Sequence, residues 1–146
     1  MRKLLIAVLI AAALLTVSHV EDAITFDTIT GLDLAREKIA AGVTIERVYY
    51  TDGFGFSTSE FETADPEEIL CLWEAVQEIV LGERVDQDIT DWYPQIIFYL
   101  SDETTFSVVF DAHWLEIGGM DHYELENAEH FWALTKTLVE KYMPCY

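Results

Sequence analysis

The sequence predicts an α+β fold, in which an antiparallel sheet of about four to five strands packs two main helices on one face. Segments rich in β-branched and aromatic residues follow one another across short turns, as antiparallel strands do. Two other segments place apolar residues at helical spacing. The order ββαβββα separates runs of neighbouring strands by single helices, and this order favours helices packed on one side of an antiparallel sheet.

The first two strands are expected at residues 43–50 and 54–61. The first is rich in β-branched and aromatic residues and ends at Thr51-Asp52-Gly53. An Asp-Gly pair between two such runs favours a tight hairpin, because this turn needs positive φ angles. The second run alternates in side-chain type, as a returning strand would.

A helix is expected from Asp65 to Gly82. Asp65 can cap its N-terminus, Pro66 suits the first helical position, and Glu68 can bond back to the cap. Gly82 is expected to end the helix. The apolar residues of its core-facing stripe recur at helical spacing and are Ile69, Leu72, Trp73, Val76 and Val80.

The second half of the chain predicts three more strands and a last helix. Residues 83–94 are expected to form a polar connection. The strands are placed at residues 95–100, 104–110 and 114–117, and residues 122–125 can pair briefly. Asn127 can cap the last helix and Pro144 stops it. Its apolar face would consist of Phe131, Leu134, Leu138 and Tyr142.

The N-terminus predicts export. A short positive start, residues 1–3, precedes an apolar run from Leu4 to Val17. This is the pattern of a secretory signal peptide, and the run is shorter than the roughly 20 residues of a membrane span. An uncleaved anchor and a buried N-terminal helix are the alternatives. We expect 1–18 to be a signal peptide, 19–42 a poorly defined N-terminal segment with a short helix over 32–41, and 43–146 a single α+β domain.

Secretion or an extracytoplasmic location follows from this signal, and no lipid-attachment cysteine follows the apolar run. The chain has 27 Asp and Glu residues against 8 Lys and Arg, a net charge of −19. Removal of residues 1–18 leaves 6 positive residues against 27 acids, a net charge of −21. Such a surface repels phosphate backbones and anionic lipids, so no nucleic acid partner is expected. Membrane contact is expected only through an uncleaved leader. The partner that fits is a cationic protein or peptide. The oligomeric state is left open.

Three parts of the chain resemble small exported domains of unknown function from Gram-positive bacteria. They are residues 45–50 leading into Asp52-Gly53, the helix start at residues 64–69, and residues 115–125. The resemblance covers roughly residues 43–142. It implies export and the fold class, and it implies no activity, cofactor or site residue.

Cys71 and Cys145 are the two cysteines, and in exported proteins two cysteines often pair. Cys71 lies early in the first expected helix and Cys145 just past the last one. The start of the first helix would lie near the end of the last helix if these two helices lay side by side and antiparallel. Against pairing, Cys71 is expected on the polar face with Glu74 and Glu78. The sequence therefore leaves two alternatives open, a disulfide between Cys71 and Cys145 or two free thiols.

The region 111–130 contains residue types that bind zinc, but in no defined metal-site spacing. They are Asp111, His113, Asp121, His122 and His130. Surface histidines are the alternative interpretation. No catalytic, cofactor-binding or metal-binding residue is predicted, and no cofactor.

Trp92, Tyr93 and Trp114 are expected at the surface near acidic residues, where aromatic rings suit capture of a cationic peptide. Packing at the edge of the core is the alternative. We therefore expect a non-catalytic domain that binds a protein or peptide at the cell surface. The alternatives are an inhibitor of a secreted cationic hydrolase, a small metal-dependent hydrolase using residues 111–130, and a domain whose sheet edge pairs with a partner strand.

Overall fold

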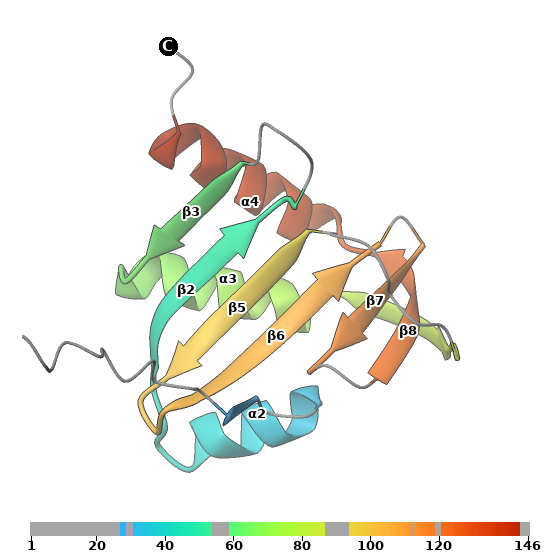
Figure 1. The fold of residues 1–146 in the computed structure, drawn as a ribbon, viewed down its shortest axis with the longest axis horizontal. Coiled ribbons are helices and arrows are strands. Elements are labelled where there is room, and N and C mark those ends of the chain that lie inside the picture. The colour runs from blue at the N-terminus through green and yellow to red at the C-terminus, as the bar shows by residue number, and fades with distance from the viewer. Residues whose placement is uncertain are drawn as a thin grey trace, which may run out of the picture.

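A computed structural model describes residues 27–28, 31–53, 59–86, 94–111, 113–118 and 121–143. Along the chain these residues form β1 (Asp27–Thr28), α2 (Leu32–Ala40), β2 (Ile45–Thr51), β3 (Glu60–Thr63), α3 (Pro66–Gln77), β4 (Val80–Arg84), β5 (Gln95–Leu100), β6 (Thr104–Phe110), β7 (Trp114–Ile117), β8 (Asp121–Asn127) and α4 (Glu129–Tyr142). The sheet runs in the order β3-β2-β5-β6-β7-β8-β4 with antiparallel neighbours, and β1 pairs parallel to the start of β6 (Figure 1).

The predicted α+β class is confirmed, but the predicted counts of four to five strands and two main helices are too low for the described part of the chain. Strands β1 and β4 add to the five main strands that the sequence indicates, and β8 is longer than the brief pairing expected at residues 122–125. The short helix expected over residues 32–41 is present as α2, a third helix. Ala35 of α2 is completely buried in the core, so this helix packs onto the same domain. Gly42 follows it with a φ of 102°, the left-handed conformation that glycine tolerates.

The predicted helix from Asp65 to Gly82 is confirmed as far as Gln77 and is wrong beyond it. Helix α3 ends at Gln77, and Val80 begins β4, where its side chain is 45% exposed. The reason is non-local. Residues Val80–Arg84 pair with β8, and this pairing overrides a helical spacing that continues through Val80 by coincidence.

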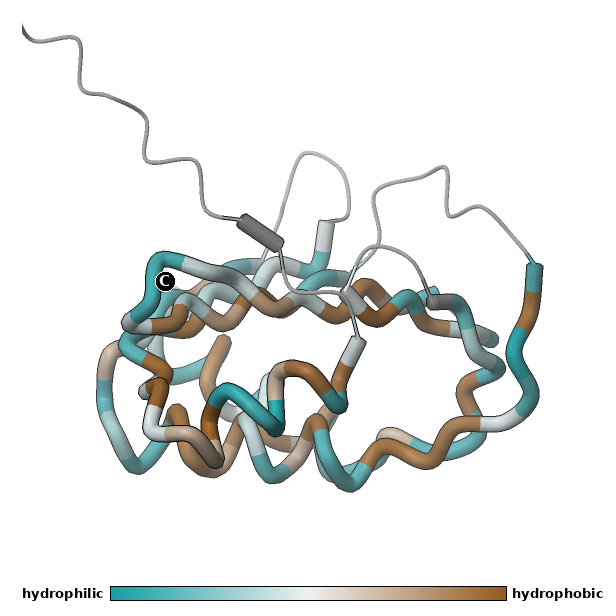
Figure 2. Tube along the Cα trace, turned by 90° about the horizontal axis from the view of Figure 1, so that it is seen from below, coloured by the Kyte–Doolittle hydropathy of each residue, from teal (hydrophilic) through white to brown (hydrophobic). Residues whose placement is uncertain are grey.

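The core lies between the sheet and the three helices, which Figure 2 shows from the side as two layers. Strand residues alternate in burial, as in β5, where every second side chain is buried. Trp73 of α3 packs edge-on against Phe98 and Phe106, with ring centroids 5.5 and 5.9 Å away. The fully buried large side chains include Phe98, Phe106, Phe110, Phe131, Leu72, Ile96 and Leu115.

Helices α3 and α4 lie side by side and antiparallel, because the start of one contacts the end of the other at both ends. Lys141 in the last turn of α4 bonds Glu68 in the first turn of α3. At the opposite ends, His130 Nδ1 lies 2.5 Å from Glu78 Oε2. The antiparallel arrangement that the cysteine argument required is therefore present.

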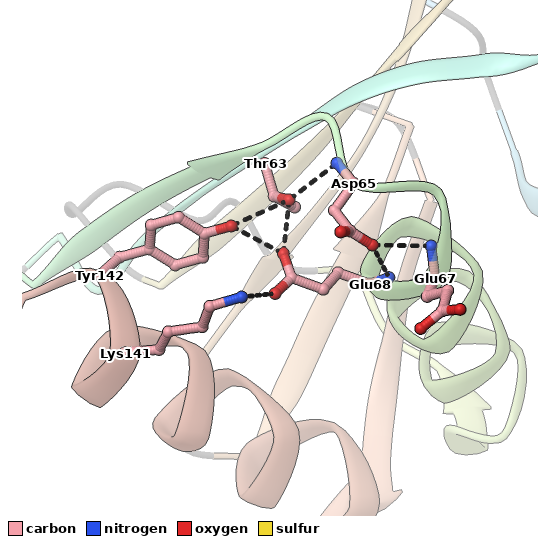
Figure 3. A network of polar contacts seen from close by, with 6 residues as sticks. All are labelled: Thr63, Asp65, Glu67, Glu68, Lys141 and Tyr142. Carbon is pink, nitrogen blue, oxygen red and sulfur yellow. Dashed lines mark hydrogen bonds and ion pairs between the residues drawn. The ribbon is translucent and has the colours of Figure 1, made fainter.

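The predicted cap of α3 is confirmed, and its predicted reciprocal bond is wrong. The Asp65 carboxylate accepts hydrogen bonds from the Glu67 and Glu68 backbone amides, and Pro66 follows as the first helical residue. Glu68 does not bond back to Asp65, whose amide donates instead to Thr63 Oγ1 at 3.1 Å. As Figure 3 shows, the Glu68 side chain turns toward α4.

The hairpin between β2 and β3 is longer than the predicted tight turn. Gly53 has the expected positive φ, 66°, but the Asp52 amide donates to the Ser59 carbonyl, so the connection spans residues 52–59. Residues 54–58 of the predicted second strand lie outside the described residues, and β3 continues to Thr63. The predicted cap of the last helix is wrong by one residue, because Ala128 is the N-cap, but Asn127 Oδ1 accepts the Glu129 amide at 2.9 Å.

The predicted signal peptide, residues 1–18, lies outside the described residues. Among the helices that the structure describes, none is long and apolar enough to cross a membrane.

Candidate binding surface

The sheet has one face that no described helix covers, and Figure 1 looks onto it with α3 and α4 behind the strands. Because Val48 and Tyr50 of β2 point into the core, Arg47 and Tyr49 point away from it. We call this side the open face. Its side chains are Arg47, Tyr49, Thr51, Glu60, Glu62, Gln95, Ile97, Tyr99, Ser107, Val109, Trp114, Glu116, His122, Glu124 and Glu126.

At the β3–β2–β5 end of the open face, Arg47 supplies a cation that its neighbours hold. Its guanidinium carbon lies 3.9 Å from the centre of the Tyr99 ring, a cation–π contact. Its Nη1 also lies 3.0 Å from Glu62 Oε2. One aromatic ring and one carboxylate thus bind a guanidinium within the sheet itself.

Tyr49 extends this end toward β3. Its hydroxyl donates to Glu60 Oε2 at 2.7 Å. That hydrogen bond, with partial burial and the negative charge of Glu60, raises the pKa of Tyr49 above its ordinary value. The Tyr49 hydroxyl therefore remains protonated and donates at neutral pH. Glu60 and Glu62, the two carboxylates of β3, both have a partner at this end of the face.

The other end of the open face, which we call the acidic end, consists of Trp114 and Glu116 of β7 and His122, Glu124 and Glu126 of β8. Glu116 and His122 are cross-strand partners, and their Oε2 and Nε2 atoms are 3.0 Å apart. Trp114 lies directly opposite Glu124 in the register, with its side chain half-buried.

Glu124 and Glu126 of the acidic end lean over the backbone of Gly82 in the neighbouring strand β4. A Cβ atom placed on Gly82 would lie 3.1 Å from Glu124 Oε2 and 3.2 Å from Glu126 Oε1. Within the described residues, neither carboxylate has a hydrogen-bond or ion-pair partner. The acidic end therefore combines an aromatic ring with two carboxylates that lack a described cation.

Of the three aromatic residues predicted to form a binding surface, the structure places Trp114 on the open face. Trp92 and Tyr93 lie outside the described residues. The sequence alone does not reveal the contribution of Glu124 and Glu126. Their position beside Trp114 depends on the register between β7 and β8 and on the irregular pairing of β4.

The candidate ligand residues of region 111–130 are divided between two sides of the sheet. His122 pairs with Glu116 on the open face, whereas His130 starts α4 and bonds Glu78 in the helix layer. His113 is exposed beside Trp114, with ring centroids 6.2 Å apart. In the part of the chain that the structure describes, no group of three His, Cys, Asp or Glu residues is arranged to hold a metal ion.

Cys71 is a free, exposed thiol on α3, as expected for its polar face. It stands three positions after Glu68, whose side chain contacts Lys141 in the last turn of α4. Cys145, its predicted partner, lies outside the described residues.

A groove of about 360 Å³ lies in the helix layer, between the start of α2 and strands β4, β7 and β8. Its lining combines apolar side chains with the two charged side chains of Asp33 and Arg36. The lining residues are Gly31, Leu32, Asp33, Leu34, Arg36, Leu81, Ile117 and Tyr123.

Comparisons of this chain with protein-family models, with curated proteins and with solved structures find no match.

Proposed function

We propose that this domain binds a cationic protein or peptide without catalysis, through the acidic end of the open face. The observation that supports the proposal most directly is the pairing of Trp114 with Glu124 across β7 and β8. The carboxylates of Glu124 and Glu126 lie on the same face, over Gly82 of the neighbouring strand, without a described partner.

The opposite end of the same face shows that an aromatic ring and a carboxylate of this sheet can hold a cation. There the Tyr99 ring and the Glu62 carboxylate together hold the Arg47 guanidinium. Trp114 and Glu124 are cross-strand neighbours of the same two kinds, an aromatic ring and a carboxylate, and Glu124 has no described cation. Tryptophan is the aromatic residue that attracts cations most strongly. A lysine or arginine side chain of a partner is the group that fits.

The charge of the whole chain supports the same kind of partner. With 27 acids against 8 Lys and Arg residues, the protein attracts cationic proteins over a distance of about a Debye length. This attraction raises the association rate, and added salt screens it. Close contacts at the acidic end would then provide the affinity that remains at physiological ionic strength.

The experiment compares two variants of equal net charge. Glu124→Gln with Glu126→Gln removes two carboxylates at the acidic end, whereas Glu74→Gln with Glu140→Gln removes two exposed carboxylates of the helix layer. Binding of a lysine- and arginine-rich peptide is measured by titration calorimetry at low and physiological salt. We expect a loss of about tenfold or more in affinity for the first variant only.

Two results would contradict this proposal. If the wild-type protein bound no basic peptide at low salt, the class of partner would be wrong. If both variants lost affinity equally, general charge attraction would replace a defined surface. Assays against secreted lysozyme-like enzymes and proteases then test whether binding also inhibits a cationic hydrolase, the narrower version of the same function.

We also propose that binding takes place outside the cytoplasm. The support is the charged start and apolar run of residues 1–17. N-terminal sequencing of the secreted protein tests this proposal. A new N-terminus near residue 19 is expected, and a protein retained in the cytoplasm with Met1 in place would reject it.

A further inference from the structure

We infer that the partner contributes an extended basic segment, which adds to the sheet as a strand beside β4. This inference rests on the proposed function, since it specifies how a cationic partner would reach the acidic end. It depends on three features: the difference between the two sheet edges, the absence of a side chain at Gly82, and the position of the carboxylates behind it.

The two edges of the sheet differ in how far the chain itself occupies them. At the β3 edge, the Glu60 amide donates to Met143 Sδ at 3.2 Å, and the Tyr142 ring stacks on Phe61 with centroids 5.9 Å apart. The end of α4 therefore lies along β3. This strand is also only four residues long. Both features oppose pairing with another chain.

The β4 edge is not covered in this way, although β4 is itself only five residues long. Strand β4 pairs with β8 on one side, and no described strand or helix lies on its other side. Val80, Glu83 and Arg84 are exposed there, and the strand contains no proline to block pairing at the edge. Two pairing irregularities, on either side of Leu81, twist β4. They limit a partner to a short segment.

Gly82 determines which partner side chains this edge favours. A strand added beside β4 would lie about 5 Å beyond it, and so about 10 Å from β8. Because Gly82 has no side chain, a lysine or arginine of the added strand can extend across it. Its charged group would then meet the Glu124 and Glu126 carboxylates, which lean over Gly82 from the far side. A shorter side chain could not span that distance.

The charge of the β4 edge favours a basic segment of a partner over a second copy of the same chain. Glu83 and Arg84 of β4 are both exposed and offset each other in charge, so the two carboxylates behind Gly82 leave this edge acidic, and the protein has a net charge of −19. Two copies would bring like charges together at this edge, which costs free energy. An extended segment with basic residues at alternate positions places every cation on the open-face side, where the carboxylates lie.

The test uses a synthetic peptide with alternating lysine and valine and two N-methylated versions of equal charge. In one version the even-numbered backbone amides carry the methyl group, and in the other the odd-numbered ones do. Only alternate amides of an added strand point toward β4. We therefore expect one version to lose at least tenfold in affinity and the other to bind like the parent peptide.

Equal affinities of the two N-methylated peptides would overturn strand addition while leaving the proposed function intact, because the parent peptide would still bind. Failure of the parent peptide itself would reject the proposed function. Amide hydrogen exchange of the full chain gives an independent readout. Bound peptide should slow exchange in β4 and leave β3 unchanged, and unchanged exchange in β4 would again reject strand addition.

Discussion

Glu68 in the first turn of α3 and Lys141 in the last turn of α4 form an ion pair, with Oε1 and Nζ 2.5 Å apart. The other carboxylate oxygen accepts hydrogen bonds from Thr63 Oγ1 and from the Tyr142 hydroxyl, at 2.5 and 2.8 Å (Figure 3). Partial burial raises the pKa of Glu68, but these bonds, that from Lys141 first, outweigh it and hold the pKa below its usual range. One carboxylate thus joins β3, α3 and α4.

Replacing this carboxylate should loosen the junction. Glu68→Gln keeps the shape but weakens the ion pair and two charge-assisted hydrogen bonds, so we expect a loss of about 1 to 2 kcal/mol in the free energy of unfolding. Urea denaturation measures it. The neighbouring Glu67→Gln is the control, since the Glu67 side chain has no described partner. Equal losses in both variants would show that helix charge, rather than the junction, is responsible.

The pH dependence of stability should follow the lowered pKa values of Glu68 and Asp102. The Lys38 ammonium and the Thr104 hydroxyl lower the pKa of Asp102. A carboxyl group with a lowered folded-state pKa stabilises the fold above its unfolded-state value, about 4. That contribution disappears as the pH falls through the folded-state pKa. Between about pH 5 and pH 2, wild type should therefore lose more stability than Glu68→Gln/Asp102→Asn.

The matched control for this pH series is Glu74→Gln/Glu140→Gln, which also removes two carboxylates. Its stability should fall with pH in parallel with wild type. Chemical unfolding at several pH values provides the data. A Glu68→Gln/Asp102→Asn variant that lost stability as steeply as wild type would contradict the assignment of these two groups.

If the protein is exported as proposed, we expect Cys71, which is a free thiol in the structure, to form a disulfide with Cys145. Cys71 lies exposed on α3, one helical turn from Glu68, which contacts the last turn of α4. Only a few residues follow that turn before Cys145, and three extended residues reach about 10 Å. Alkylation of the unreduced protein, read by mass spectrometry, should modify neither cysteine. Two modified cysteines would reject the pairing.

If the disulfide forms, its removal should lower stability. In the chain-entropy model, closing the long loop between the two cysteines stabilises the protein by about 4 kcal/mol. Cys71→Ser should therefore lower the unfolding midpoint in oxidising buffer. In reducing buffer the same variant should match wild type, because an exposed thiol contributes little packing. Equal midpoints in oxidising buffer would contradict a stabilising disulfide.

Local signals predicted the helix starts to within one residue. Asp65 and Pro66 mark the start of α3, and Asn127 lies one residue before the N-cap of α4, because caps and first-turn preferences depend on residues only two or three positions apart. The alternation in β6 likewise reads directly as one buried and one open face. Residues 95–100 are apolar on both faces in the sequence, so the burial of every second side chain of β5 could not be predicted from them.

The same reasoning from local signals was wrong at the end of α3, because the strand that follows depends on pairing with a distant segment. The spacing of Val76 and Val80 fits a helix, yet Val80 belongs to a strand that exists only because β8 pairs with it. The approach of Glu124 to Gly82 depends on that pairing. The sequence therefore predicts the aromatic residue of the acidic end but not the position of its carboxylates. Trp114 was identified as a surface aromatic, whereas its acidic neighbours required the register of β8.

The Arg47 contacts at the β3–β2–β5 end allow a test of how strongly the open face holds a cation. A double-mutant cycle combines Arg47→Gln with Glu62→Gln and measures the free energy of unfolding for the four proteins. The ion pair is partly exposed, so a favourable coupling of about 0.2 to 1 kcal/mol is expected, smaller at high salt. The same cycle with Glu60 in place of Glu62 is the control, because Glu60 bonds Tyr49 instead. Coupling no larger than in this control would remove the precedent for cation binding.

Trp114 should provide the aromatic half of the cation site at the acidic end. Trp114→Ala removes a cation–π contact worth about 0.5 to 2 kcal/mol, so affinity for the lysine- and arginine-rich peptide should fall by roughly 2- to 30-fold. Trp114→Phe should recover part of the loss, because phenylalanine offers a weaker ring. Leu70→Ala, which alters a side chain 55% exposed on α3, is the control and should bind like wild type. If Trp114→Phe bound no better than Trp114→Ala, the contribution of the ring face would be excluded, and the carboxylates of Glu124 and Glu126 would have to account for binding alone.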